Sequence, residues 1–228
     1  MEKLDYVKAQ IIVSNYIDNM RESSIKAIQF NYECANKRFE LFKYLKDSTD
    51  ALVHASEDVM TMLNASDSIK EFTKIVMLNA NIGRYRQVKL YGSLDDSILA
   101  SELGINNHGE LGDLVLSDLI GKEVPNPYLQ MPIRRIVRNH VNKELDESSL
   151  GILSNSSIMS GDISSILIGN PEQARFIDAM TLLVRDLENL EVYPRSFGDN
   201  HGRNSFKLSN SFNVKYNEDL AKVKSLHL

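Results

Sequence analysis

The fold class is decided by residues 13–45, VSNYIDNMRESSIKAIQFNYECANKRFELFKYL. This stretch contains neither proline nor glycine, and its apolar positions recur at alternating steps of four and three, the spacing of one helix face. A second apolar row runs beside the first at Ile28, Tyr32, Ala35, Phe39 and Phe42. Two adjacent rows make a stripe broad enough for a core-facing helix. The polar residues Ser24, Asn31 and Arg38 interrupt the first row and argue against a strict coiled coil.

The helical pattern extends over the whole N-terminal part of the chain. Residues 1–91 contain no proline and only one glycine, Gly83, and such a stretch favours helix. Short polar turns between long helices are typical of neighbouring helices that run antiparallel. We therefore predict a mainly α protein whose residues 1–92 form an antiparallel bundle of about three long helices.

Two polar clusters predict where these helices begin and end. Asp47–Asp50 offers side-chain oxygens that cap helices and predicts a boundary near Ser48. A second boundary is predicted near Ser66, where Ser68 and Glu71 stand at the spacing of a capping box. The third helix is then expected to continue to the glycine at position 92.

Shorter helices packed on the bundle are predicted for residues 93–190. Up to Tyr128, apolar clusters alternate with glycines, which indicates two short helices. An extended connector is then predicted by Pro125, Pro127 and Pro132. For residues 148–170, the sequence is compatible with short helices and with a covered loop. Pro171 fits the first turn of a further helix that ends near Leu190.

The helical period fails in residues 191–228, which we predict to be an irregular tail. Two six-residue segments repeat there, NSFKLS at 204–209 and NSFNVK at 210–215. Their apolar and polar residues alternate, which favours a small β-hairpin or two extended arms. Residues 217–228 are long enough to add a terminal helix.

Composition places the chain among ordinary globular proteins and excludes several classes. It has 228 residues, with 43% hydrophobic and 25% charged residues and a net charge of −5. The lone cysteine, Cys34, excludes an internal disulfide and suits a reducing compartment. No stretch approaches the roughly 20 apolar residues of a membrane span, and no secretion signal is visible at the N-terminus. We expect a soluble protein of the cytoplasm.

Catalytic chemistry has one candidate, the loop Arg195–Arg203. It gathers four polar or charged residues within nine positions: Arg195, Asp199, His201 and Arg203. A histidine as general acid or base beside arginines that hold phosphate charge would suit a phosphodiester- or nucleotide-directed hydrolase. No spacing in the loop is diagnostic, and a solvated turn accounts for the same residues.

Metal and nucleotide motifs are not predicted. His108-Gly109-Glu110 matches the first element of the zinc deaminase signature, but the required pair of cysteines is missing from a chain with Cys34 alone. His54 and Glu57 have helical spacing without the second histidine of a zincin motif. No cofactor and no metal site are therefore predicted, and an enzymatic role is not favoured.

A basic helix is predicted at residues 133–143. It carries Arg134, Arg135, Arg138 and Lys143, without any acidic residue. The neighbouring segments are acidic, because residues 144–194 contain nine acidic residues and two arginines. We expect these neighbours to neutralise the basic helix within the fold or across an oligomer interface, leaving an acidic protein partner or a nucleic acid as further possibilities.

The function that these features favour is that of a non-enzymatic helical adaptor, an accessory subunit of a larger assembly. The absence of catalytic constellations, the long helices with mixed faces and the separated blocks of charge point to it. The alternatives are the hydrolase with the Arg195–Arg203 loop and a nucleic-acid-binding protein that uses the basic helix. A protein partner is expected, homo-oligomerisation is open, and the net negative charge disfavours nucleic acid.

Overall fold

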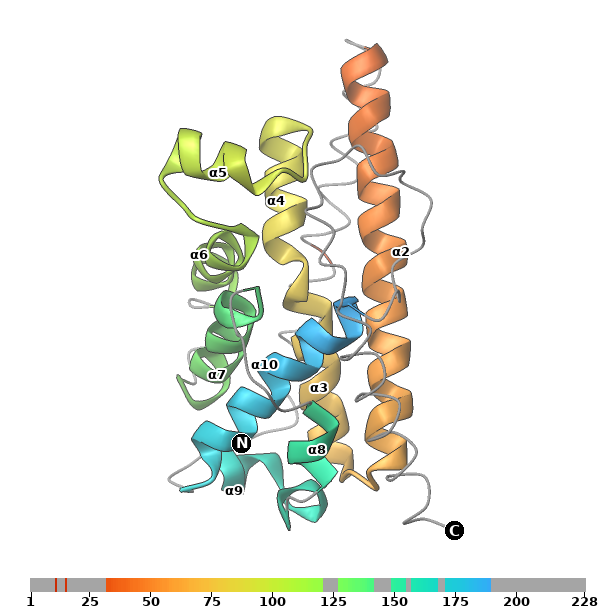
Figure 1. Ribbon diagram of the computed structural model, residues 1–228, viewed down its shortest axis with the longest axis vertical. Helices are drawn as coiled ribbons and strands as arrows, with labels where there is room; N and C mark the ends of the chain where they lie inside the picture. The colour runs from red at the N-terminus through yellow and green to blue at the C-terminus, as the bar shows by residue number, and fades with distance from the viewer. Residues whose placement is uncertain are drawn as a thin grey trace.

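The structure is a computed structural model, which describes residues 32–120, 127–141, 149–154, 157–167 and 171–189, together with Ile11 and Asn15. Every regular element in these ranges is a helix, so the prediction of a mainly α protein is confirmed. Figure 1 shows the long helix α2 with the other helices gathered along one side of it. Among the described residues, none of the helices has the length and apolar character needed to cross a bilayer.

Helix α2, Tyr32–Met62, is one uninterrupted helix of 31 residues. The predicted boundary in the Asp47–Asp50 cluster, near Ser48, is therefore wrong. The Thr49 hydroxyl of this cluster is satisfied inside the helix instead of capping an end. Thr49 Oγ1 donates to the carbonyl oxygen of Leu45 at 2.8 Å, and Ser48 is fully buried. Such bonding to the preceding turn is the usual way in which a helix interior accommodates threonine.

Helix α3, Asp67–Ala80, begins at the second predicted boundary, which is confirmed. Its N-cap is Ser66, whose Oγ accepts a hydrogen bond from the backbone N–H of Ile69 at 3.4 Å. The capping box predicted at Ser68 is wrong, because that residue lies inside the helix. Its Oγ accepts the backbone N–H of Ile163 at 3.0 Å and so fixes a distant segment to α3.

Helix α4, Ile82–Tyr91, follows α3 after one non-helical residue, Asn81. The single third helix of the prediction is therefore two helices, although its end near Gly92 is confirmed. The break allows the buried side-chain amide of Asn81 to reach Thr49 Oγ1 of α2 at 3.5 Å. Gly92 adopts a left-handed conformation with φ 61°, which ends α4 as glycine commonly does. In Figure 1, α3 and α4 run back along α2.

The glycine-rich middle contains two short helices, as predicted. Helix α5, Asp96–Leu103, begins after Asp95, whose carboxylate accepts the backbone N–H of Ser97 at 2.9 Å. It ends at Gly104, which is left-handed with φ 65°. Helix α6, His108–Ile120, follows after four residues.

Helix α7, Pro127–Asn139, starts where an extended connector was predicted. That prediction is wrong for Pro127 and Pro132. Pro127 is the first helical residue, where a missing N–H costs no hydrogen bond. Pro132 lies inside the helix, but its missing N–H would have bonded only to Tyr128 in the first turn, so the disruption is confined to that end. Pro125 lies outside the described residues.

Short helices occupy the segment that the sequence left open between helices and loop. The elements that complete the described fold are α8 (Ser149–Ser154), the 3₁₀ helix η1 (Ser157–Ser160), α9 (Ile163–Leu167) and α10 (Gln173–Asn189). The buried Asp186 of α10 holds α8, because its carboxylate accepts the backbone N–H of Ser149 at 2.9 Å. Burial raises the pKa of Asp186, although its hydrogen bonds with Ser149 and Arg185 act in the opposite direction.

Two clusters of buried side chains hold the described helices together. The larger one is centred on α3 and α10, where the rings of Phe72 and Phe176 lie 5.9 Å apart. The smaller one joins α2 to α4 and contains Phe42 stacked on Tyr85 at 6.1 Å. The larger cluster draws side chains from both sides of Gly92. The division into residues 1–92, 93–190 and 191–228 stays a prediction.

Three glycines allow α4, α6 and α7 to approach one another closely. A Cβ atom at Gly83 of α4 would lie 1.9 Å from the carbonyl oxygen of His108 in α6. On α6, a Cβ atom at Gly109 would lie 2.7 Å from the carbonyl oxygen of Val137, and one at Gly112 would lie 2.8 Å from the Val137 side chain. Cβ atoms do not approach backbone atoms this closely, so glycine is required at Gly83 and Gly109. These contacts position the ends of α6 and α7, where the candidate site lies.

Candidate functional site

A buried group of polar side chains lies where α6, α7 and α10 begin or end. His108 is the first residue of α6, His140 directly follows α7, and Glu188 belongs to the last turn of α10. Both histidines are buried, and the Glu188 side chain is 17% exposed. Their donor atoms all lie within 4.8 Å of one another. Two imidazole nitrogens and a carboxylate oxygen are a donor set that binds metal ions.

The orientation of His108 is set by Asp96 in α5. Its Nδ1–H donates to Asp96 Oδ2 at 2.9 Å, so that its second ring nitrogen, Nε2, carries a lone pair. Asp96 is itself paired through Oδ1 with Arg84 of α4 at 3.0 Å. Burial lowers the pKa of His108 to about 3, and the charge of Arg84 acts in the same direction. The imidazole is therefore neutral at physiological pH.

The carboxylate of Asp96 stays ionised in this arrangement. Burial by itself raises the pKa of Asp96, but hydrogen bonding to His108 and the charge of Arg84 outweigh burial and hold the pKa below its usual value. Arg84 also donates to the carbonyl oxygen of Leu94, which fixes its guanidinium beside α5. The Arg84–Asp96–His108 chain is thus a rigid support for one imidazole.

The second histidine is supported by the backbone of α7. His140 Nδ1–H donates to the carbonyl oxygen of Val137 at 2.6 Å. Its Nε2 is buried and, within the described part of the chain, has no hydrogen-bond partner. Glu188 Oε1 lies 3.6 Å from this nitrogen. The rings of His108 and His140 meet edge to face with centroids 5.2 Å apart.

Sequence reasoning missed this cluster, because its members come from three separate elements with no fixed spacing. The His108-Gly109-Glu110 fragment contributes only its histidine. The Glu110 carboxylate accepts hydrogen bonds from Asn106 at 2.9 and 3.1 Å and is exposed. These bonds lower the pKa of Glu110. Only the contacts between helices reveal that His140 lies beside His108.

The arginines of the predicted basic helix lie beside acidic residues of α6 and α10. Arg134 Nε is 2.6 Å from one oxygen of Asp113, and Arg138 is 3.7 Å from the other. Arg135 is 3.9 Å from Asp178, which is beyond hydrogen-bond distance. The fold therefore places Arg134 and Arg138 beside α6 and Arg135 beside α10. Lys143 lies outside the described residues.

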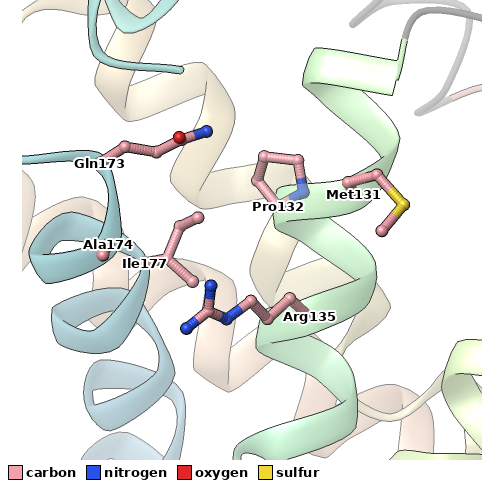
Figure 2. Close-up of a pocket in the computed structure, with 6 residues that line it drawn as sticks. All are labelled: Met131, Pro132, Arg135, Gln173, Ala174 and Ile177. Carbon is pink, nitrogen blue, oxygen red and sulfur yellow. The ribbon is translucent and has the colours of Figure 1, made fainter. Parts of the chain in front are cut away.

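A shallow groove between α7 and α10 lies beside these arginines. Figure 2 shows Arg135 reaching from α7 toward α10, with Ile177 and Ala174 on the opposite wall. Met131 and Pro132 belong to the α7 side, and Gln173 completes the lining. Met131 is 57% exposed and the Arg135 side chain 53% exposed. The groove thus combines apolar surface with one accessible guanidinium.

The predicted catalytic loop Arg195–Arg203, with Asp199 and His201, lies outside the described residues, as do the repeat and the predicted terminal helix. Comparison of the chain with protein families, curated proteins and solved structures finds no significant match.

Proposed function

We propose that this protein is a non-enzymatic helical adaptor that binds a partner protein through the groove between α7 and α10. The observation that carries the proposal is the pairing of Met131 and Arg135, both more than half exposed, at one groove. Methionine and arginine are enriched in the buried centre of protein interfaces relative to the rest of protein surfaces. Methionine adapts its shape to a partner, and arginine adds directional hydrogen bonds.

The chemistry of the groove specifies an amphipathic partner segment with acidic residues. Arg135 has an acidic neighbour in Asp178, but the 3.9 Å separation leaves its guanidinium free to form a bidentate pair with a carboxylate of the partner. Apolar side chains of the same segment would cover Ala174 and Met131, which are both exposed. Nucleic acid is disfavoured, because Asp113 lies against both Arg134 and Arg138 and lowers the positive potential on this side of α7.

The remaining parts of the molecule have supporting roles in this proposal. The N-terminal helices would form the antiparallel bundle that serves as a rigid platform, and the segment 191–228, which contains the repeated six-residue sequence, would provide a second contact. The lone cysteine, Cys34, supports a location in the cytoplasm. A second copy of the chain remains an alternative partner.

Site-specific photo-crosslinking tests the groove directly. We expect a photoreactive amino acid at position 131 to crosslink in cells of the native host to one protein, through a segment that contains acidic and apolar residues. Arg135→Glu in the same chain should reduce the yield at least about tenfold, because a favourable charge pair becomes a repulsive one. Mass spectrometry of the crosslinked peptide measures both results.

The matched control places the photoreactive residue at Leu103 of α5, which is also exposed but lies outside the groove. The proposal is contradicted if positions 131 and 103 give the same products. Crosslinks at position 131 to nucleic acid, or to a basic segment, would equally contradict it. A crosslink to this chain itself would replace the partner protein with a homo-oligomer.

A further inference from the structure

We propose that His108, His140 and Glu188 bind one divalent transition-metal ion of the zinc type. The three side chains come from the ends of α6, α7 and α10, and their donor atoms lie within 4.8 Å of one another. Two histidines and one carboxylate are a known ligand set for zinc, with at least one further position filled by water or another ligand. This inference does not depend on the adaptor function, and either proposal can fail alone.

Both histidines have the supporting contacts that metal-binding histidines have. A ligand imidazole usually donates its other N–H to a carboxylate or a backbone carbonyl, which fixes the tautomer and aims the free nitrogen at the metal. His108 donates to the carboxylate of Asp96 at 2.9 Å, and His140 donates to the carbonyl of Val137 at 2.6 Å. In both rings, Nε2 is therefore the nitrogen available for a metal ion.

The contact between His140 and Glu188 requires something positive between the two groups. With Nδ1 as the donor, His140 Nε2 carries a lone pair, and it faces Glu188 Oε1 at 3.6 Å. A lone pair and a carboxylate oxygen are both acceptors, so the contact is favourable only with a proton or a metal ion between them. This nitrogen is buried without a hydrogen bond among the described residues, an arrangement that costs free energy unless a ligand is present.

Binding of a metal ion would require only small movements of the three donor atoms. Bonds of about 2.1 Å to a tetrahedral ion place neighbouring donor atoms roughly 3.4 Å apart. The His140–Glu188 pair, at 3.6 Å, is already near this separation, and every pair in the cluster is within 4.8 Å. Rotation of the Glu188 side chain, which is 17% exposed, would bring its carboxylate closer to the two imidazoles.

The surrounding charges favour a cation. Asp96 balances Arg84 at 3.0 Å, and Glu188 adds a carboxylate to the cluster. The carbonyl ends of α7 and α10 also lie here, and the C-terminal end of a helix attracts positive charge. The N-terminal end of α6 acts in the opposite direction. A bound ion would join the ends of three helices and stabilise their packing.

The experiment uses the full chain, stripped with a chelator and titrated with Zn²⁺ and with Co²⁺. We expect one tightly bound Zn²⁺ per chain, with an apparent Kd below about 1 μM, and a rise in Tm. Bound Co²⁺ should show the intense visible absorption of a tetrahedral site. Glu188→Gln and His140→Gln should each weaken binding by more than about 100-fold, since loss of an outer partner alone costs roughly 10–100-fold.

Two further variants keep the test decisive if a ligand variant fails to fold. Asp96→Asn changes no metal ligand but removes the carboxylate that supports His108 and pairs with Arg84, and it should weaken Zn²⁺ binding roughly 10–100-fold. His54→Gln changes an exposed histidine on α2 and should bind as the wild type does. Equal affinity of the wild type and Glu188→Gln, or a wild-type Co²⁺ spectrum like that of the hydrated ion, would overturn the proposal. The proton shared by His140 and Glu188 would then explain their contact.

Discussion

Gly83→Ala is expected to lower the free energy of unfolding by about 3 kcal/mol, the upper end of the usual cost of overpacking a close contact. A Cβ atom at this position would lie 1.9 Å from the carbonyl oxygen of His108 and 2.7 Å from the backbone nitrogen of Gly112. Both are backbone atoms, so α4 and α6 must move apart. Alanine normally stabilises a helix relative to glycine by about 1 kcal/mol, so the sign of the effect is itself diagnostic.

Urea denaturation of the variant and of a control measures this effect. The control is Gly104→Ala, because no atom lies within 4 Å of a Cβ atom there and the left-handed backbone alone should cost about 1 kcal/mol. A Gly83→Ala protein as stable as the wild type would show that α4 and α6 do not pack as the structure places them.

The free energy of unfolding is expected to fall by about 2 kcal/mol between pH 7 and pH 5 because of His108. Burial lowers the pKa of this histidine to about 3, whereas in the unfolded chain it titrates near 6.5. Between these two values the unfolded state binds the proton and the folded state does not, so stability rises with pH. The free energy of unfolding therefore has its full value, as far as His108 is concerned, above about pH 6.5 and decreases as the pH falls below that value.

Unfolding curves recorded from pH 5 to pH 7 in the presence of a chelator isolate this contribution. Asp96 and Glu110 have lowered pKa values and titrate at more acidic pH, whereas the raised pKa of Asp186 makes a contribution of opposite sign, so the His108 contribution is the difference between the wild type and His108→Gln. His108→Gln should flatten the dependence, and His54→Gln, at an exposed residue, should preserve it. An unchanged slope in His108→Gln would refute the buried neutral imidazole.

Helices with regular apolar spacing could be predicted from the sequence. Predictions that relied on local polar residues or prolines were wrong where those residues lie in helices packed into the core. The Asp47–Asp50 cluster was interpreted as a helix cap because its side-chain oxygens can accept backbone N–H groups. In the structure, Thr49 donates to the preceding turn instead, and the helix continues. Pro132 was interpreted as a helix breaker, but it removes only one backbone hydrogen bond, in the first turn of α7. In both places burial of apolar side chains outweighed a local preference.

The candidate site could not be predicted, because it depends on contacts between distant elements. His108 and His140 are separated by 32 positions and meet only because Gly109 allows α6 to approach the carbonyl oxygen of Val137. No spacing rule encodes that approach. The arginines of α7 were visible as a basic stretch, but their acidic neighbours, Asp113 and Asp178, follow from packing.

The adaptor proposal is tested most directly by purifying the tagged chain from its native host and comparing three forms. They are the wild type, the groove variant Met131→Asp with Arg135→Glu, and the control Leu103→Asp on α5. We predict a protein that is retained by the wild type and by the control and lost from the groove variant, with similar Tm values for all three. The same proteins on all three forms, or a lone monomer by light scattering of the wild-type eluate, would contradict the proposal.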